Sequence, residues 1–275
     1  MNVISLFDGI SVARVALDYA DIKVKKYYSA EIDKYAIQVS TKNYPDIIRL
    51  GSVVDITAEK LVLPEGEHFD LLIGGSPCQD LSIAKKDRKG LDGDRSGLFW
   101  EYIRIRDLIK PKYFILENVA SMHKKDKDII TEAMGVEPIL FNASLVSAQT
   151  RKRLFWTNIK FEMPDDRGII LKDILQEGAE VDERMVNADK KAYTLTATYQ
   201  GAFEKNSVKK KQRTMVKSNT NTIRKLTPLE CERLQSLPDE YTEGVSKTQR
   251  YKCIGNAFNA EVIAHILQNI PKNQN

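Results

Sequence analysis

The sequence predicts an α/β fold in which a parallel sheet is followed by a small, irregular region. Apolar or β-rich runs alternate with amphipathic helical segments from residue 2 to about residue 161. This alternation is typical of parallel strands joined by right-handed crossovers. It ends near Gly178, and the chain is polar from there to about Ser246. An apolar stripe at residues 262–270 needs a surface to cover, so we expect the last helix to return to the sheet.

These changes of composition divide the 275 residues into a large α/β domain (1–178), a small domain (179–248) and a C-terminal segment on the large domain (249–275). Hydrophobic residues make up 42% and charged residues 29%, as in folded globular proteins. No apolar run reaches membrane-spanning length, and the N-terminus lacks the features of a signal peptide. We therefore expect a cytoplasmic protein with no membrane partner.

The first half of the large domain is predicted to contain three strands and two helices. The strands are at 2–7, 24–30 and 47–50. Ser11 and Asp33 each precede a helical stripe of apolar residues. Both residue types are favoured helix N-caps, because the side-chain oxygen accepts a bond from a free backbone N–H.

The remaining elements follow from similar patterns. Further strands are predicted at 69–73, 113–116, 138–143 and 154–161, and a helix begins near Ser96. In the polar region, Thr227, Pro228 and Glu230 have the spacing of a capping box with proline at the first helical position. They predict one short helix there.

Cys78 is the candidate nucleophile. It follows the apolar run 69–73 and two glycines, so it is expected just beyond the carboxyl end of a buried strand. Open α/β sheets place ligands and catalytic groups there. A lone cysteine is also often only a small apolar side chain, and position alone does not decide between the two. Cys231 and Cys253 form no metal-ligand spacing, so we expect no metal site.

Two other strand ends indicate a cofactor site. The turn Phe7-Asp8-Gly9-Ile10-Ser11 has N–H groups that suit a carboxylate, and it lacks the G-x-G-x-x-G spacing of pyrophosphate-binding turns. Glu31, after the second strand, either accepts bonds from ribose hydroxyls or caps the next helix. A carboxylate-binding turn, an acidic residue and a nucleophile on successive strand ends together indicate S-adenosyl-L-methionine.

The stretch from Glu204 to Lys225 is strongly basic. Its cations are Lys205, Lys209, Lys210, Lys211, Arg213, Lys217, Arg224 and Lys225, and only Glu204 opposes them. A solvated loop explains this composition. A phosphate-contacting segment explains the one-sided charge as well, and both interpretations stay open.

Six motifs, in order, resemble those of the DNA (cytosine-5) methyltransferase family. They are Phe7-Asp8-Gly9, Gly75-Ser76-Pro77-Cys78-Gln79, Glu117-Asn118-Val119, Gln149-Thr150-Arg151-Lys152-Arg153, the helix 226–238, and Gly255-Asn256-Ala257. The resemblance extends from residue 2 to about residue 267. Each motif is weak alone, but six in family order are specific. They imply a Rossmann-like S-adenosylmethionine-dependent methyltransferase sheet with a small target-recognition domain.

The resemblance also implies a role for each site residue. Cys78 would attack C6 of a flipped cytosine, and Glu117, protonated and buried, would act at N3. Arg153 would hold O2, with Arg151 as a structural or phosphate-contacting partner. The cofactor pocket would be lined by Phe7, Asp8, Gly9, Ile10, Ser11, Glu31, Ile32, Ser52, Val53, Pro77, Leu98, Asn256 and Ala257. Ser52 stands where the family usually has aspartate, so either Ser52 or Asp55 would contact adenine.

Double-stranded DNA is the implied partner of a monomeric enzyme, with a cognate restriction enzyme where one accompanies it. The implied DNA contacts are Gln79, Ser82, Arg95, Thr194, Thr196, Lys209, Lys210 and Lys211. Two alternatives are a tRNA cytosine-5 methyltransferase and an inactive DNA-binding or partner-binding homologue. The absence of a Cys-Phe-Thr signature argues against the first. The presence of Cys78, Glu117 and Arg153 together argues against the second.

Overall fold

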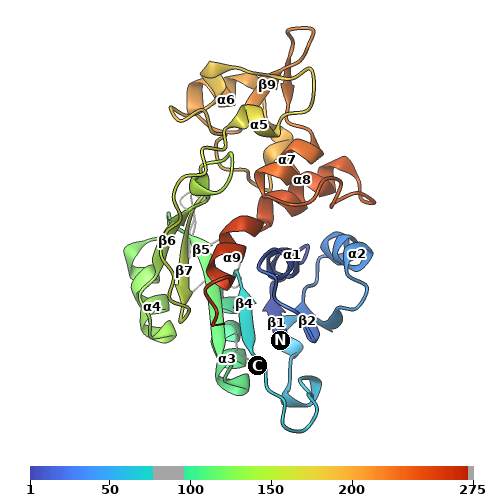
Figure 1. The fold of residues 1–275 in the computed structure, drawn as a ribbon, viewed down its shortest axis with the longest axis vertical. Coiled ribbons are helices and arrows are strands. Elements are labelled where there is room, and N and C mark those ends of the chain that lie inside the picture. The colour runs from blue at the N-terminus through green and yellow to red at the C-terminus, as the bar shows by residue number, and fades with distance from the viewer. Residues whose placement is uncertain (77–95, 272–275) are drawn as a thin grey trace.

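The computed structural model describes residues 1–76 and 96–271. The predicted site residues Pro77, Cys78, Gln79, Ser82 and Arg95 lie outside these ranges. Within them, no helix is long and apolar enough to cross a membrane. The described chain forms a seven-stranded sheet with helices around it, and a smaller region with its own three-stranded sheet (Figure 1).

The large sheet has the strand order β3-β2-β1-β4-β5-β7-β6. Its strands are β1 (Asn2–Leu6), β2 (Lys26–Ala30), β3 (Ile48–Gly51), β4 (Leu71–Gly74), β5 (Tyr113–Val119), β6 (Ile139–Asn142) and β7 (Lys152–Thr157). The predicted α/β class and the positions of all seven strands are confirmed.

One strand departs from the predicted parallel sheet. Strand β7 runs antiparallel to both of its neighbours, β5 and β6. Only residues 143–151 connect β6 to β7, and the regular structure among them is a single 3₁₀ turn, Ala143–Leu145. Parallel neighbours need a crossover of about a dozen residues or more, so this short connection requires the chain to reverse direction.

Helices cover both faces of the sheet. One face packs α1 (Val12–Tyr19) and α9 (Ala260–Leu267) against alternate strand residues such as Val3 and Ile73. The other packs α3 (Phe99–Ile109) and α4 (Lys124–Met134) against their neighbours Ile4 and Leu72. Helix α2 (Lys34–Asn43) packs beside α1. The position of α9 confirms that the last helix returns to the large sheet.

The smaller region forms a separate hydrophobic cluster. It contains β8 (Glu180–Val181), β9 (Met215–Lys217), β10 (Ile223–Lys225), α5 (Leu171–Ile174), α6 (Glu204–Lys210), α7 (Pro228–Leu234) and α8 (Lys247–Asn256). The cluster begins before the predicted boundary at 178, since it includes Leu171, and continues past 248, since it includes Tyr251 and Ile254. Helices α6 and α8 were not predicted, and α8 leads from this region into α9 (Figure 1).

Two of the three predicted caps form as expected. Asp33 accepts bonds from the backbone N–H groups of Tyr35 and Ala36, and Thr227 forms the predicted capping box with Glu230. Ser11 does not cap its helix, because its backbone is left-handed, with φ 59°. Its hydroxyl donates instead to the carboxylate of Asp8 at 2.5 Å.

The buried carboxylate of Glu230 yields a stability prediction. It is fully buried and is held by both terminal nitrogens of Arg224, at 2.7 and 2.8 Å. Arg224→Met leaves this charge buried without its cation, so we expect the free energy of unfolding to fall by about 3 kcal/mol. Urea denaturation measures the change.

The matched control is Arg233→Met in α7, the helix that also contains Glu230. Arg233 pairs with Asp239, whose side chain is about half exposed, and exposed pairs contribute less than about 1 kcal/mol. Equal losses in the two variants would contradict the prediction.

Candidate active site

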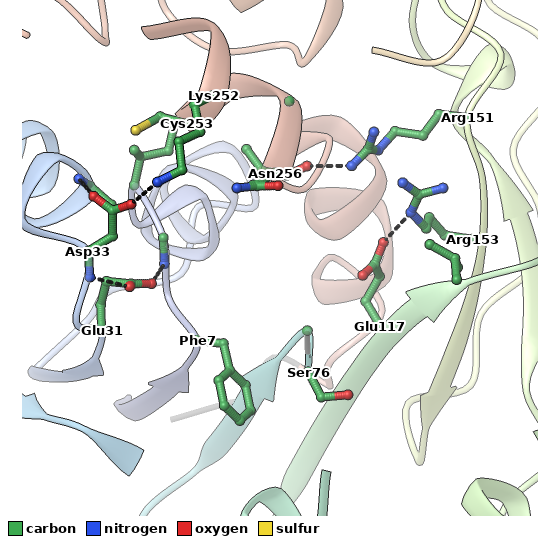
Figure 2. A pocket seen from close by; sticks show the side chains of 17 residues that line it. Phe7, Glu31, Asp33, Ser76, Glu117, Arg151, Arg153, Lys252, Cys253 and Asn256 are labelled. Carbon is green, nitrogen blue, oxygen red and sulfur yellow. Dashed lines mark hydrogen bonds and ion pairs between the residues drawn. The ribbon is translucent and has the colours of Figure 1, made fainter. Parts of the chain in front are cut away.

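A cavity of about 250 Å³ opens at the carboxyl ends of the strands (Figure 2). Its lining comes from the ends of β1, β2, β4 and β5, from β7, and from α2 and α8. The lining residues are Phe7, Gly9, Ile10, Glu31, Asp33, Ala36, Gly75, Ser76, Glu117, Val119, Arg151, Arg153, Lys252, Cys253, Gly255, Asn256 and Ala257. Residues from both ends of the chain therefore share one cavity.

The turn after β1 is differently organised from the sequence expectation. Its N–H groups were expected to bind a carboxylate, but three of them are bonded within the protein. Gly9 N–H donates to Glu31 Oε2 at 2.7 Å, Asp8 N–H to the carbonyl of Ala30, and Ser11 N–H to that of Asp8. Phe7, Gly9 and Ser11 all have φ between 56° and 59°.

Asp8 does not line the cavity, and its side chain instead holds the turn from the buried side. Its buried carboxylate accepts hydrogen bonds from the hydroxyls of Ser11, Tyr27 and Ser29, at 2.5 to 2.7 Å. Burial, and then the nearby Asp8 charge, raise the pKa of the Tyr27 hydroxyl well above its usual value, so Tyr27 stays a donor. The predicted cofactor residues Asp8 and Ser11 thus hold the shape of the turn.

Glu31 lines the cavity and also orders the backbone around it. One oxygen accepts from Gly9, and the other accepts from the N–H groups of Ile32 and Asp33 at 2.8 Å. Helix α2 is capped by Asp33, so the alternative in which Glu31 is the cap is wrong. The oxygen bonded to Gly9, Oε2, accepts only that bond from the described residues and has a further lone pair, so Glu31 can still accept from a ligand.

Besides Asp8 and Ser11, four predicted cofactor residues do not line this cavity. Ile32 is 75% exposed, and Val53 is buried in the core beneath β3. Leu98 packs against the same core. Ser52 directly precedes the 3₁₀ turn Val53–Asp55. Phe7, Gly9, Ile10, Glu31, Asn256 and Ala257 are the predicted cofactor residues that the structure brings together.

Glu117 and Arg153 form an ion pair inside the cavity. Arg153 Nε lies 2.7 Å from Glu117 Oε1, and both side chains are less than one-fifth exposed (Figure 2). Glu117 is opposite Phe155 in the antiparallel β5–β7 ladder, so Arg153, two residues away, is on the same face. The sequence analysis expected a buried, protonated Glu117 and did not place Arg153 against it, because the direction of β7 was not predicted.

Arg151 has a structural position. It is buried, and its two terminal nitrogens donate to the carbonyls of Leu195 and Ala257, each at 2.8 Å. Of the two roles that the sequence left open, the geometry supports the structural one.

Asn118 was not predicted as a functional residue. Its side-chain amide donates to the hydroxyl of Ser76 at 3.1 Å and to the Ser76 carbonyl at 3.4 Å. It therefore holds the chain two positions before Cys78. A Cβ at the neighbouring Gly75 would lie 2.8 Å from the ring of Phe258 and 3.2 Å from Glu117 Oε2, so a larger residue at position 75 would displace these two side chains.

The basic stretch 204–225 was open to two interpretations, a solvated loop or a phosphate-contacting segment. In the structure it contains α6, β9 and β10. Arg213, Arg224 and Lys225 are bonded to protein groups, whereas Lys209 and Lys210 are exposed at the end of α6. The hydroxyl of Thr194 donates to the carbonyl of Thr150 at 2.6 Å. The predicted DNA contacts in this region thus differ in role, since Thr194 is engaged within the protein.

Comparison with known proteins identifies the family. The profile described as C-5 cytosine-specific DNA methylase matches residues 1–166 and 167–272. This chain belongs to that family. The membership confirms the predicted resemblance and enzyme class, a DNA (cytosine-5) methyltransferase.

Individual relatives agree. The orphan methyltransferase M.SPRI of Bacillus phage SPR is 33% identical over 74% of this chain, which spans 48% of that protein. The type II methyltransferase M.HhaI of Haemophilus parahaemolyticus is 27% identical over 100% of this chain and 95% of its own length. The solved Entamoeba histolytica methyltransferase EhMeth has a TM-score of 0.74 at 17% identity, covering 98% of this chain and 97% of its own, which shows the shared fold.

The remaining cysteines are predicted to be unreactive in the folded protein. Burial raises the pKa of the Cys253 thiol to about 12 and that of Cys231 well above its usual value. Thiolate is the reactive form, so in a Cys78→Ser protein we expect no labelling by iodoacetamide at neutral pH. Labelling should appear only as the pH approaches about 12, or after unfolding in urea. Mass spectrometry reads the sites, and neutral-pH labelling of folded Cys253 would contradict this.

Proposed function

We propose that this chain transfers the methyl group of S-adenosyl-L-methionine to C5 of a cytosine that has been flipped out of duplex DNA. The observation that carries the proposal is the single cavity shared by the Glu117–Arg153 pair and by Glu31 and Asn256. Base-modifying enzymes that act on duplexes extrude their target because its reactive atoms are inaccessible inside the stack.

The lining suits a nucleoside that bears an amino acid. Phe7 offers an aromatic surface, Glu31 offers an acceptor for hydroxyls, and Asn256 offers both a donor and an acceptor. S-adenosyl-L-methionine, when bound there, supplies an electrophilic methyl group. The residues that would hold it come from β1, β2 and α8.

The protein residues would activate the base. The Cys78 thiolate would add to C6, which makes C5 electron-rich and divides one difficult step into easier ones. Glu117, once protonated, would donate a hydrogen bond at N3, and Arg153 would leave its ion pair with Glu117 to hold O2. Both residues come from the β5–β7 pair. After C5 has gained the methyl group, a base removes its proton and the Cys78–C6 bond breaks, which restores the thiolate. Asn118 would position Cys78 through Ser76.

We propose that residues 179–248 carry target recognition and that double-stranded DNA is the partner. The exposed Lys209 and Lys210 support the first assignment, and the description of the family as a DNA methylase supports the second. The bacterial and phage origin of the relatives M.SPRI and M.HhaI supports action in the cytoplasm of a bacterial or phage-infected cell.

The decisive test is bisulfite sequencing of DNA from cells that express the protein. We expect 5-methylcytosine at one short sequence with the native chain and none with Cys78→Ser, whose nearly isosteric change preserves the fold. Duplex DNA with 5-fluorocytosine at the target should form a covalent adduct with the native enzyme, since no C5 proton can leave. The proposal would be refuted if tRNA were methylated and DNA were not, or if the Cys78→Ser protein turned over at the native rate.

The lysines of α6 should contribute affinity without choosing bases. Replacing Lys209 and Lys210 by Gln should weaken binding to every duplex and lower the log–log salt slope by about two, since each phosphate contact contributes about 0.9. The charge-matched control is Lys60→Gln with Lys124→Gln, both exposed and outside the small region. Fluorescence anisotropy at several salt concentrations measures both pairs, and equal slopes would exclude these phosphate contacts.

A further inference from the structure

Gly255 lies unusually close to the small region. A Cβ built there would be 2.2 Å from the carbonyl carbon of Thr196, and 2.3 Å from its oxygen and from the nitrogen of Ala197. All three are backbone atoms, which cannot rotate aside as a side chain does. Gly255 is inside α8, so helix geometry does not require glycine there. The missing side chain instead permits two backbones to touch.

Helix α8 is the more firmly held of the two segments. Ile254 and Tyr251 are buried, and the Tyr251 hydroxyl donates to the carbonyl of Leu226 at 2.6 Å. The side-chain amide of Gln235 donates to the carbonyl of Ile254 at 2.9 Å. Each of these contacts restrains the helix immediately before Gly255.

The facing segment, residues 196–198, is bonded at its two ends and within its own turn, where the Thr196 carbonyl accepts from Tyr199 N–H at 2.9 Å and the Thr198 carbonyl from Gly201 N–H at 3.0 Å. Before it, Leu195 is buried and bonded to Gln149 and Arg151. After it, Arg213 donates to the Thr198 hydroxyl at 2.8 Å. Thr196 and Thr198 themselves are exposed. A side chain at position 255 would therefore displace residues 196–198 rather than α8.

This segment is also next to the catalytic cavity. Gly255 and Asn256 both line the cavity, and Gly255 contacts Thr196 from the other side. Figure 1 places α6, which bears the exposed lysines, at the end of the small region away from the large sheet. Exposed hydroxyls beside the cavity are suited to meeting base edges close to the target cytosine, because hydroxyls both donate and accept.

We propose that Gly255 determines target specificity by setting where residues 196–198 lie relative to the catalytic cavity, a role separate from cofactor binding by its neighbour Asn256. The proposal rests on the proposed DNA methylation. It makes Gly255 a positioning residue, since it acts through Thr196 and Thr198. Its loss should change the choice of DNA sequence more than it changes binding of the cofactor.

The test compares Gly255→Ala with Asn256→Ala. Calorimetric titration with S-adenosyl-L-methionine measures cofactor affinity, and kcat/KM on the target and on single-mismatch duplexes measures discrimination. A mismatched base pair usually lowers affinity by roughly 5- to 150-fold. Discrimination is the ratio of kcat/KM on the target to kcat/KM on a single-mismatch duplex. We expect this ratio to fall about tenfold in Gly255→Ala, while its cofactor affinity stays within about twofold. Asn256→Ala should bind the cofactor more weakly and keep the ratio.

Thr198→Ala provides a second variant that leaves α8 unchanged, in case Gly255→Ala does not fold. It removes the Arg213 bond that holds the end of the segment, so discrimination should fall without a loss of cofactor affinity. Unchanged discrimination in the folded variants, or a Gly255→Ala effect confined to cofactor affinity, would overturn the proposal. If the native chain methylates no duplex DNA, the proposed function falls as well. If the native chain methylates DNA normally and the variants keep their discrimination, only the proposed role of Gly255 is refuted, and the proposed function stands.

Discussion

The buried guanidinium of Arg151 joins three parts of the molecule that are distant in the sequence. It extends from the residue before β7 and donates to Leu195 in the small region and to Ala257 after α8. A buried cation is costly unless its donors are bonded, and backbone carbonyls provide acceptors that stay in place when side chains move. This one side chain therefore ties together the cavity residues at the end of α8, the small region and the start of β7.

Buried amides reinforce the same junction. Gln149 accepts from Leu195 N–H and donates to the carbonyl of Leu234, and it also donates to Gln235, which in turn donates to Ile254 and Ala257. These groups are almost fully buried, so removing one would leave its partner unbonded at a cost of about 1–3 kcal/mol. Such a network favours one arrangement of the large domain relative to the small region. A site that uses residues of both regions requires a fixed arrangement.

The catalytic side of the cavity depends on strand direction. Because β7 is antiparallel to β5, Arg153 lies on the same face as Glu117 and pairs with it. Asn118, the next residue of β5, points to the other side and holds Ser76 at the end of β4. One strand thus positions both Glu117, which is proposed to act on the base, and the backbone that precedes Cys78, the proposed nucleophile.

The sequence by itself determined the seven strands of the large sheet, two of the three predicted caps and the order of the motifs, because periodicity, capping boxes and motif spacing are local properties. It thereby indicated Glu31, Glu117 and Asn256 as members of one site. Only the tertiary structure decided that Asp8 supports the turn from below, that Glu117 faces Arg153, that Arg151 is a structural link, and that Gly255 touches Thr196. These facts depend on strand direction and on contacts between residues far apart in the chain, which no local pattern encodes.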